Sequence, residues 1–167
     1  MQRPLPSIAT VRPAVRHYFP ITTLRVEPGE PVPDFAATPN LAAFRGAPLL
    51  LNVFSVSCGP CIREVPKLNA LHAANPDLQV LALCAEDAEE AARFRRRHGL
   101  TWPVVAPGAD YVYTRLGIEG IPAFLLLDAD GRLLGSTYAN QVADAQGYVT
   151  VDGLRAWVAA LGGPRLR

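Results

Sequence analysis

The chain has 167 residues, of which 50% are hydrophobic and 19% are charged, a composition that suits one globular domain with its own core. A formal net charge of +1 argues against a broad binding surface for nucleic acid or for an anionic membrane. No stretch approaches the roughly 20 apolar residues of a membrane span, and three cysteines are too few for a disulfide-stapled scaffold.

The N-terminal region is rich in proline, with seven of the 16 prolines inside residues 1–33. We expect residues 1–29 to form an extended arm, with a short strand around Thr22–Val26, and residues 30–167 to form the domain. Met1–Pro20 lacks the apolar region of a signal peptide. The chain is therefore expected either to be cytoplasmic or to have lost a signal or membrane anchor.

Apolar runs and helix signals alternate along the domain. After a helical turn at Asn40–Phe44, the run Leu49–Phe54 is broken only by Asn52, as in a strand that is buried on both faces. Further strands are expected at Gln79–Cys84, Ala123–Leu127 and Leu133–Tyr138, and helices at Cys58–Ala74, Glu86–His98, Asp110–Leu116 and Asp152–Leu161, the last with Asp152 as its N-cap. Strands joined by helices, with a closing hairpin, predict an α/β fold in which helices flank a mixed β-sheet.

Cys58 and Cys61 are separated by Gly59 and Pro60 at the start of a predicted helix. Disulfide exchange needs an accessible thiolate and a second thiol that can resolve the mixed disulfide. A cysteine at a helix N-terminus lies among unpaired N–H groups in the favourable field of the helix dipole, which lowers its pKa from about 8.5. Proline is tolerated there because a first-turn residue has no helical hydrogen bond to lose. The pattern predicts a redox-active pair.

Two structural interpretations of the pair stay open. It could be half of a zinc site, but zinc needs further ligands, and His17, His72, His98 and Cys84 are scattered along the chain. It could also be a purely structural disulfide, although so small a loop stabilises a fold little. Cys84 itself is expected to be a small buried hydrophobe, with a regulatory thiol as the alternative.

Three segments resemble the thioredoxin-fold oxidoreductases: Leu49–Cys61 with Glu64 after it, Gly120–Phe124, and Asp128–Gly131. The opening Pro33-Asp34-Phe35 is similar, more narrowly, to their TlpA/ResA type. The resemblance covers about residues 30–162 and implies a thioredoxin-like fold and exchange with the thiols and disulfides of partner proteins. It also implies an extracytoplasmic setting, with cytochrome maturation or periplasmic thiol reduction as family roles. We expect an unknown electron donor, no cofactor beyond the cysteine pair, no metal and a monomer.

The resemblance assigns roles to single residues. Cys58 would be the attacking thiol and Cys61 the resolving thiol. Pro122 matches the cis-proline that faces the cysteine pair in this fold, and Ile121 would offer backbone hydrogen bonds to a partner's extended chain. Cis bonds are rare even before proline. Without the cysteine motif, Pro122 would read as an ordinary proline at the start of a strand.

Glu64 stands three residues after Cys61, where the TlpA/ResA type has an acidic residue. A carboxylate there could exchange a proton with Cys61 during the reaction; the alternative is a solvated glutamate on a helix surface. Asn52 occupies the strand position where thioredoxin itself has a buried aspartate. This departure leaves Glu64 as the better candidate for proton transfer.

Other features concern the partner. Ser57 stands where the family usually has tryptophan, so Ser57, Gly59 and Pro60 would present a different docking surface. The Gly-Pro pair between the cysteines resembles that of reducing thioredoxins and favours a reductant. Residues 139–151 form a longer connection than the fold requires and are a candidate for specificity.

Two other functions stay open. A peroxiredoxin-like thiol peroxidase shares the fold, but no threonine lies three residues before Cys58. A non-catalytic binding module would use the cysteine pair as a structural or metal clip. Removing the pair would then change folding more than activity.

Overall fold

A single mixed β-sheet forms the centre of the computed structural model, which describes residues 17–167. Within these residues the sheet has the strand order β3-β2-β1-β4-β5. The strands are β1 (Leu49–Phe54), β2 (Gln79–Cys84), β3 (Val104–Val105), β4 (Ala123–Leu127) and β5 (Leu133–Tyr138). β2 lies parallel to β1 and β3, whereas β4 runs antiparallel to β1 and β5. The predicted mixed sheet is confirmed.

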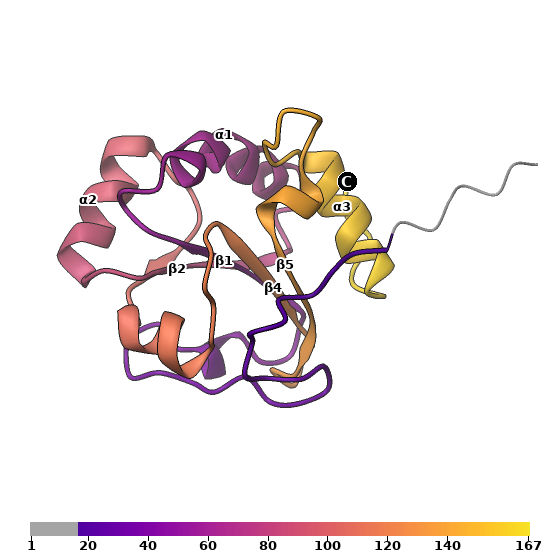
Figure 1. Cartoon of the computed structure of the whole chain (residues 1–167), viewed down its shortest axis with the longest axis horizontal. Helices are drawn as coiled ribbons and strands as arrows, with labels where there is room; N and C mark the ends of the chain where they lie inside the picture. Colours follow the sequence, from indigo (N-terminus) through magenta and orange to yellow (C-terminus); the bar gives the residue numbers. More distant parts are fainter. Residues whose placement is uncertain (1–16) are drawn as a thin grey trace, which may run out of the picture.

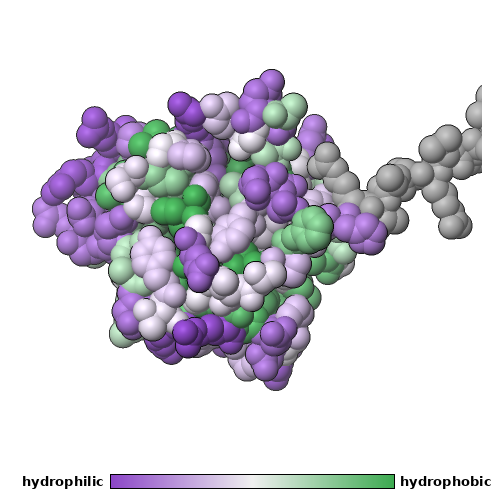
Figure 2. Space-filling view, viewed as in Figure 1, coloured by the Kyte–Doolittle hydropathy of each residue, from purple (hydrophilic) through white to green (hydrophobic). Residues whose placement is uncertain are grey.

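Helices cover both faces of the sheet (Figure 1). One face carries α1 (Gly59–Ala74), α2 (Ala88–His98) and α3 (Val151–Ala160), and the other carries the π-helix η2 (Asp110–Arg115) with the N-terminal segment. Two short 3-10 helices, η1 (Leu41–Phe44) and η3 (Ala139–Val142), complete the described elements. In the view of Figure 2, several small hydrophobic areas lie among hydrophilic side chains. No helix in residues 17–167 is long and apolar enough to cross a membrane.

β1 is the central strand of the sheet. Its side chains alternate between two hydrophobic clusters, so Leu50 and Phe54 face the helices α1 to α3, whereas Leu51 and Val53 face the opposite layer. All six residues of the strand are buried, because the sheet is covered on both faces and β1 has a neighbour on each side. The apolar run therefore predicted this strand correctly.

The short strand expected around Thr22–Val26 is wrong. This segment forms turns and bends, in which the N–H of Leu24 donates to the carbonyl of Ile21. The hydroxyl of Thr23 donates to the carbonyl of Gly117 at 2.6 Å, so its polar groups pair with a loop rather than with a strand. Ile21 and Val26 are nevertheless buried in the core layer beside η2. The predicted domain boundary at residue 30 stays a prediction, and residues 1–16 of the predicted arm lie outside the residues that the structure describes.

Two helix starts also differ from the expectation. α3 is capped by Thr150, whose side chain accepts from the N–H of Gly153 at 2.9 Å, while Asp152 pairs with Arg155 at 2.7 Å. α2 begins at Ala88 with Asp87 as its N-cap, so Glu86 lies before the helix and is free to contact another segment. Several residues near each start can cap a helix, and tertiary packing selects among them.

The connection between β5 and α3 is ordered. Residues 139–142 form η3, and Ala143 and Val149 form an isolated β-bridge around a turn. Asp144 closes that turn by accepting the N–H groups of Gln146 and Tyr148, each at 3.0 Å. Gly153 of α3 packs directly on the backbone of Val142, which holds this connection against the helix.

We predict that Gly153→Ala destabilises the protein, although alanine is the better helix former by about 1 kcal/mol. An added Cβ would collide with the backbone carbonyl of Val142, and backbone cannot move aside as a flexible side chain can. We expect a loss of roughly 2 kcal/mol in the free energy of unfolding, measured by urea denaturation. Ala156→Gly on the exposed side of α3 is the control for intrinsic propensity. A Gly153→Ala protein that is more stable than the wild type would contradict the close packing.

Candidate active site

The two cysteines of the motif form a disulfide at the N-terminus of α1, with their Cα atoms 5.2 Å apart. Cys58 is the N-cap of the helix, and its sulfur accepts the N–H of Cys61 at 3.2 Å. Cys61 is only 2% exposed, whereas Cys58 is partly exposed. The sulfur of Cys58 is therefore the one that a partner can reach, and the helix dipole favours its thiolate.

The residues predicted to dock a partner lie around the cysteine pair. Ser57, Gly59 and Pro60 are exposed, and the peptide bond between Ile121 and Pro122 is cis, which confirms the predicted isomer. A groove of about 300 Å³ runs beside the pair. Its lining residues are Pro60, Gly120, Ile121, Pro122, Tyr138, Ala139, Asn140 and Gly147. The structure thus brings Pro60 and Pro122 to one groove, as expected for a partner-binding surface.

Glu64 lies inside the protein on the turn of α1 that follows Cys61. Its side chain is 3% exposed, so the alternative of a solvated surface glutamate is wrong. The amide of Asn52 donates to Oε1 at 2.8 Å, and Oε2 has no hydrogen-bond partner among the described residues. Burial raises the pKa of Glu64 to about 8, although the bond from Asn52 and the charge of Lys67 act in the opposite direction. The carboxyl group is therefore mostly protonated at neutral pH.

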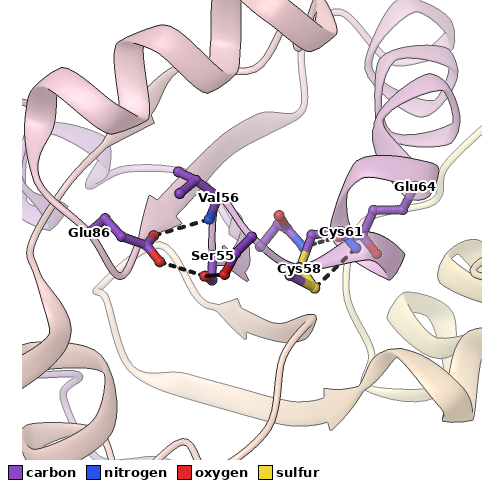
Figure 3. Close-up of a disulfide and its surroundings, with 8 residues drawn as sticks. Ser55, Val56, Cys58, Cys61, Glu64 and Glu86 are labelled. Atoms are coloured by element: carbon purple, nitrogen blue, oxygen red, sulfur yellow. Dashed lines mark hydrogen bonds between the residues drawn. A yellow bond between two sulfur atoms is a disulfide. The ribbon is translucent and has the colours of Figure 1, made fainter.

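A second carboxylate, Glu86, was not identified from the sequence. It follows β2, accepts the hydroxyl of Ser55 through Oε1 and accepts the N–H of Val56 through Oε2 at 3.1 Å. Figure 3 shows Glu86 facing Ser55 and Val56, with Cys58 further along the same segment and Glu64 on α1 beyond Cys61. Glu86 thus fixes the segment that leads into Cys58. The sequence carried one signal for this role of Glu86, which is its position just after β2. β2 is the parallel neighbour of β1, and parallel strands end at the same edge of the sheet.

Cys84 is fully buried, as the sequence predicted. Its thiol donates to Oε2 of Glu86 at 3.3 Å. Burial raises its pKa to about 12, and the nearby charges of Glu86 and Glu90 add to the increase. Cys84 is therefore an uncharged thiol at neutral pH and a weak nucleophile.

The described residues contain no group of three or more histidine, cysteine, aspartate or glutamate side chains that could hold a metal ion. The reactive groups of this arrangement are the two sulfurs of the cysteine pair. The protonated carboxyl group of Glu64 lies on the buried side of the pair, and the open groove lies on its exposed side.

Comparisons with known proteins agree with this geometry. The family model described as Redoxin matches residues 27–155. The thiol-disulfide oxidoreductase ResA of Geobacillus thermodenitrificans is 30% identical over 114 residues, which cover 63% of this chain and 66% of that protein. The chain thus matches just under two thirds of the length of this relative.

Solved structures show the same thioredoxin-like fold. A thiol:disulfide interchange protein from Bacteroides sp. superposes with a TM-score of 0.64 at 16% identity, covering 84% of this chain and 93% of its own. A secreted Mycobacterium tuberculosis disulfide oxidoreductase, homologous to Escherichia coli DsbE, superposes with a TM-score of 0.57 at 23% identity, covering 71% of this chain and 85% of its own. At these identities the likeness concerns the fold.

We predict that the protonation of Glu64 makes the free energy of unfolding fall as the pH rises. In the unfolded chain the carboxyl ionises near its ordinary value of 4.5, whereas the folded protein keeps it protonated up to about pH 8. The folded state therefore binds more protons across this window. Its free energy of unfolding should fall by at most about 1.4 kcal/mol per pH unit between these values, with no further loss from this group above the window.

The measurement is urea denaturation of the oxidised wild type and of Glu64→Gln at several pH values between about 5 and 8. Other titrating groups are common to both proteins, so the difference between their unfolding free energies isolates Glu64. We expect the wild type to lose stability relative to Glu64→Gln as the pH rises. A difference that stays constant would show that Glu64 ionises normally in the folded state.

Proposed function

The chain belongs to the Redoxin family, and from this premise we propose that it is a thiol–disulfide oxidoreductase that reduces disulfides of partner proteins. The observation that carries the proposal is the Cys58–Cys61 disulfide at the start of α1, with one sulfur accessible and the other buried. This arrangement supplies both a nucleophile and a resolving thiol. The ResA relative is a thiol-disulfide oxidoreductase, which supports the same assignment.

The reaction has two exchange steps. The thiolate of Cys58 attacks one sulfur of the partner disulfide, forming a mixed disulfide and releasing the other partner sulfur as a thiolate that takes up a proton. Cys61 then loses its proton and attacks the sulfur of Cys58. The intramolecular disulfide forms, the bond to the partner breaks, and the partner leaves with both sulfurs reduced. Two electrons have passed to the partner, and a separate thiol donor restores the Cys58–Cys61 dithiol.

Glu64 is proposed as the group that exchanges a proton with Cys61: its ionised form, the minor form at neutral pH, accepts the proton that Cys61 loses, and its protonated form returns it in the reverse step. Both residues are buried on successive turns of α1, so bulk water has little access to the proton that Cys61 must lose. A carboxyl group with a pKa of about 8 is close to the ordinary pKa of a thiol, about 8.5. Proton transfer between groups of matched pKa costs little free energy in either direction.

The groove beside Pro122 is proposed as the docking site. The backbone of Ile121 would pair with an extended segment of the partner, and the exposed Ser57, Gly59 and Pro60 would border it. The Gly-Pro pair between the cysteines supports the reducing direction. The secreted Mycobacterium tuberculosis protein of similar fold supports an extracytoplasmic setting. The electron donor and the monomeric state stay predictions.

We predict that Cys61→Ser traps the partner. Without the resolving thiol, the mixed disulfide on Cys58 should accumulate, and mass spectrometry without reductant should find insulin covalently attached when insulin is the test substrate. Cys58→Ser should form no such adduct because it lacks the accessible nucleophile. Cys84→Ser, which keeps a donor to Glu86, serves as the control and should reduce insulin like the wild type. The absence of an adduct in Cys61→Ser would argue against the exchange mechanism.

We also predict a low reduction potential for the pair. Equilibration with dithiothreitol should give a reversible two-electron couple at about −250 mV or below, as in proteins that reduce partner disulfides. Cys61→Ser is the control and should show no intramolecular couple. A value near about −120 mV would instead identify an oxidant.

A further inference from the structure

The connection between β5 and α3 forms a wall beside the cysteine pair. Its turn is closed by Asp144, and Gly147 adopts a left-handed conformation with φ of 85°. Beyond the turn, Val149 is buried and Thr150 caps α3. These constraints place Tyr148 at a defined position although its side chain is 37% exposed.

Two cations of α1 lie against the ring of Tyr148. The guanidinium carbon of Arg63 is 5.1 Å from the ring centroid and the ammonium nitrogen of Lys67 is 5.9 Å from it. Arg63 also donates a hydrogen bond to the hydroxyl of Tyr148 at 2.6 Å. We call Arg63, Lys67 and Tyr148 the basic wall. The ring orients both cations, since cations favour the face of an aromatic ring.

The basic wall continues the groove beside Pro122. A narrow pocket joins the two, since Pro60, Pro122, Ala139 and Gly147 line both the pocket and the groove. Arg63, Glu64, Lys67, Tyr148 and Val149 complete the lining of the pocket. A polypeptide segment that lies in the groove next to Cys58 would therefore extend over Arg63 and Lys67.

The positive charge of the basic wall is not balanced locally. The ion pairs among residues 17–167 are Arg93–Glu89 and Arg155–Asp152, and neither involves Arg63 or Lys67. Glu64 is the acidic residue in the lining of the narrow pocket, but burial raises its pKa to about 8, so it carries little negative charge at neutral pH. Two cations thus line the narrow pocket next to the groove, and neither forms an ion pair with a carboxylate among the described residues.

We propose that the basic wall selects partner segments that carry an acidic side chain close to the disulfide cysteine. This inference rests on the proposed function and names the substrate class of the same site. An aspartate or glutamate beside the cysteine would pair with Arg63 and Lys67 while the cysteine sulfur faces Cys58. A lysine or arginine at that place would be repelled. Complementary charge of this kind raises the rate of productive encounter and disfavours wrong partners.

The test uses two peptide probes of equal length. Each has one central cysteine in mixed disulfide with 2-mercaptoethanol, and the residues on both sides of the cysteine are aspartate in one probe and lysine in the other. The second-order rate of reduction by the dithiol form of the protein is measured at low salt. We expect the aspartate probe to react about tenfold faster, and the ratio to shrink in about 0.5 M NaCl because salt screens exposed charges.

Variants of the protein test whether the basic wall causes the preference for the aspartate probe. The double change Arg63→Gln/Lys67→Gln should bring the ratio of the two rates close to one. Arg96→Gln removes the same kind of charge from an exposed position of α2 and should keep the wild-type ratio. Urea denaturation checks that each variant is folded.

The outcomes separate the two proposals. Equal rates for both probes in the wild type would overturn the acidic preference while leaving the reductase function intact. A preference that survives the double change would overturn its assignment to the basic wall. Reduction of neither probe would overturn the proposed function, and with it the inference that rests on it.

Discussion

The burial of β1 on both faces is the constraint on which the rest of the site depends. Its six buried residues fix where the strand ends and therefore where α1 can begin. The register then brings two other segments to the same edge. Phe54 pairs with Cys84 at the end of β2, so Glu86 reaches the loop before Cys58. Val53 pairs with Ala123 at the start of the antiparallel β4, which places Pro122 beside the cysteine pair.

The buried pair of Asn52 and Glu64 illustrates a balance between stability and reactivity. A carboxyl group with an unpartnered oxygen inside the protein costs free energy, and natural folds keep such groups where function needs them. Here the burial that disfavours ionisation also brings the pKa of Glu64 close to that of a thiol. Glu86 has the opposite situation, because both its oxygens accept hydrogen bonds. One carboxylate therefore stabilises the loop, and the other is suited to proton transfer.

The proposed acidic preference would change partner choice without altering the chemistry of the cysteine pair. Cys58, Cys61 and Pro122 lie on or next to the central elements, whereas Tyr148 lies on the connection that precedes α3. That connection is held by the close approach of Gly153 to Val142 and by the bonds of Asp144. A connection held in this way fixes the ring of Tyr148, which orients Arg63 and Lys67. Less side-chain entropy then remains to be lost when a partner binds.

Local pattern in the sequence determined β1, β2, β4, β5, the helix that begins at the cysteine motif and the type of chemistry, because each depends on residues within a few positions of one another. The cis-proline instead followed from a family resemblance that connects Pro122 with the distant cysteine motif. Tertiary structure decided the rest. The absent strand at Thr22–Val26 reflects pairing with Gly117, and the contacts of Asn52 with Glu64, Ser55 with Glu86 and Arg63 with Tyr148 join residues 12, 31 and 85 positions apart. Such contacts follow from strand register and from how helices pack on the sheet, and no local periodicity encodes either.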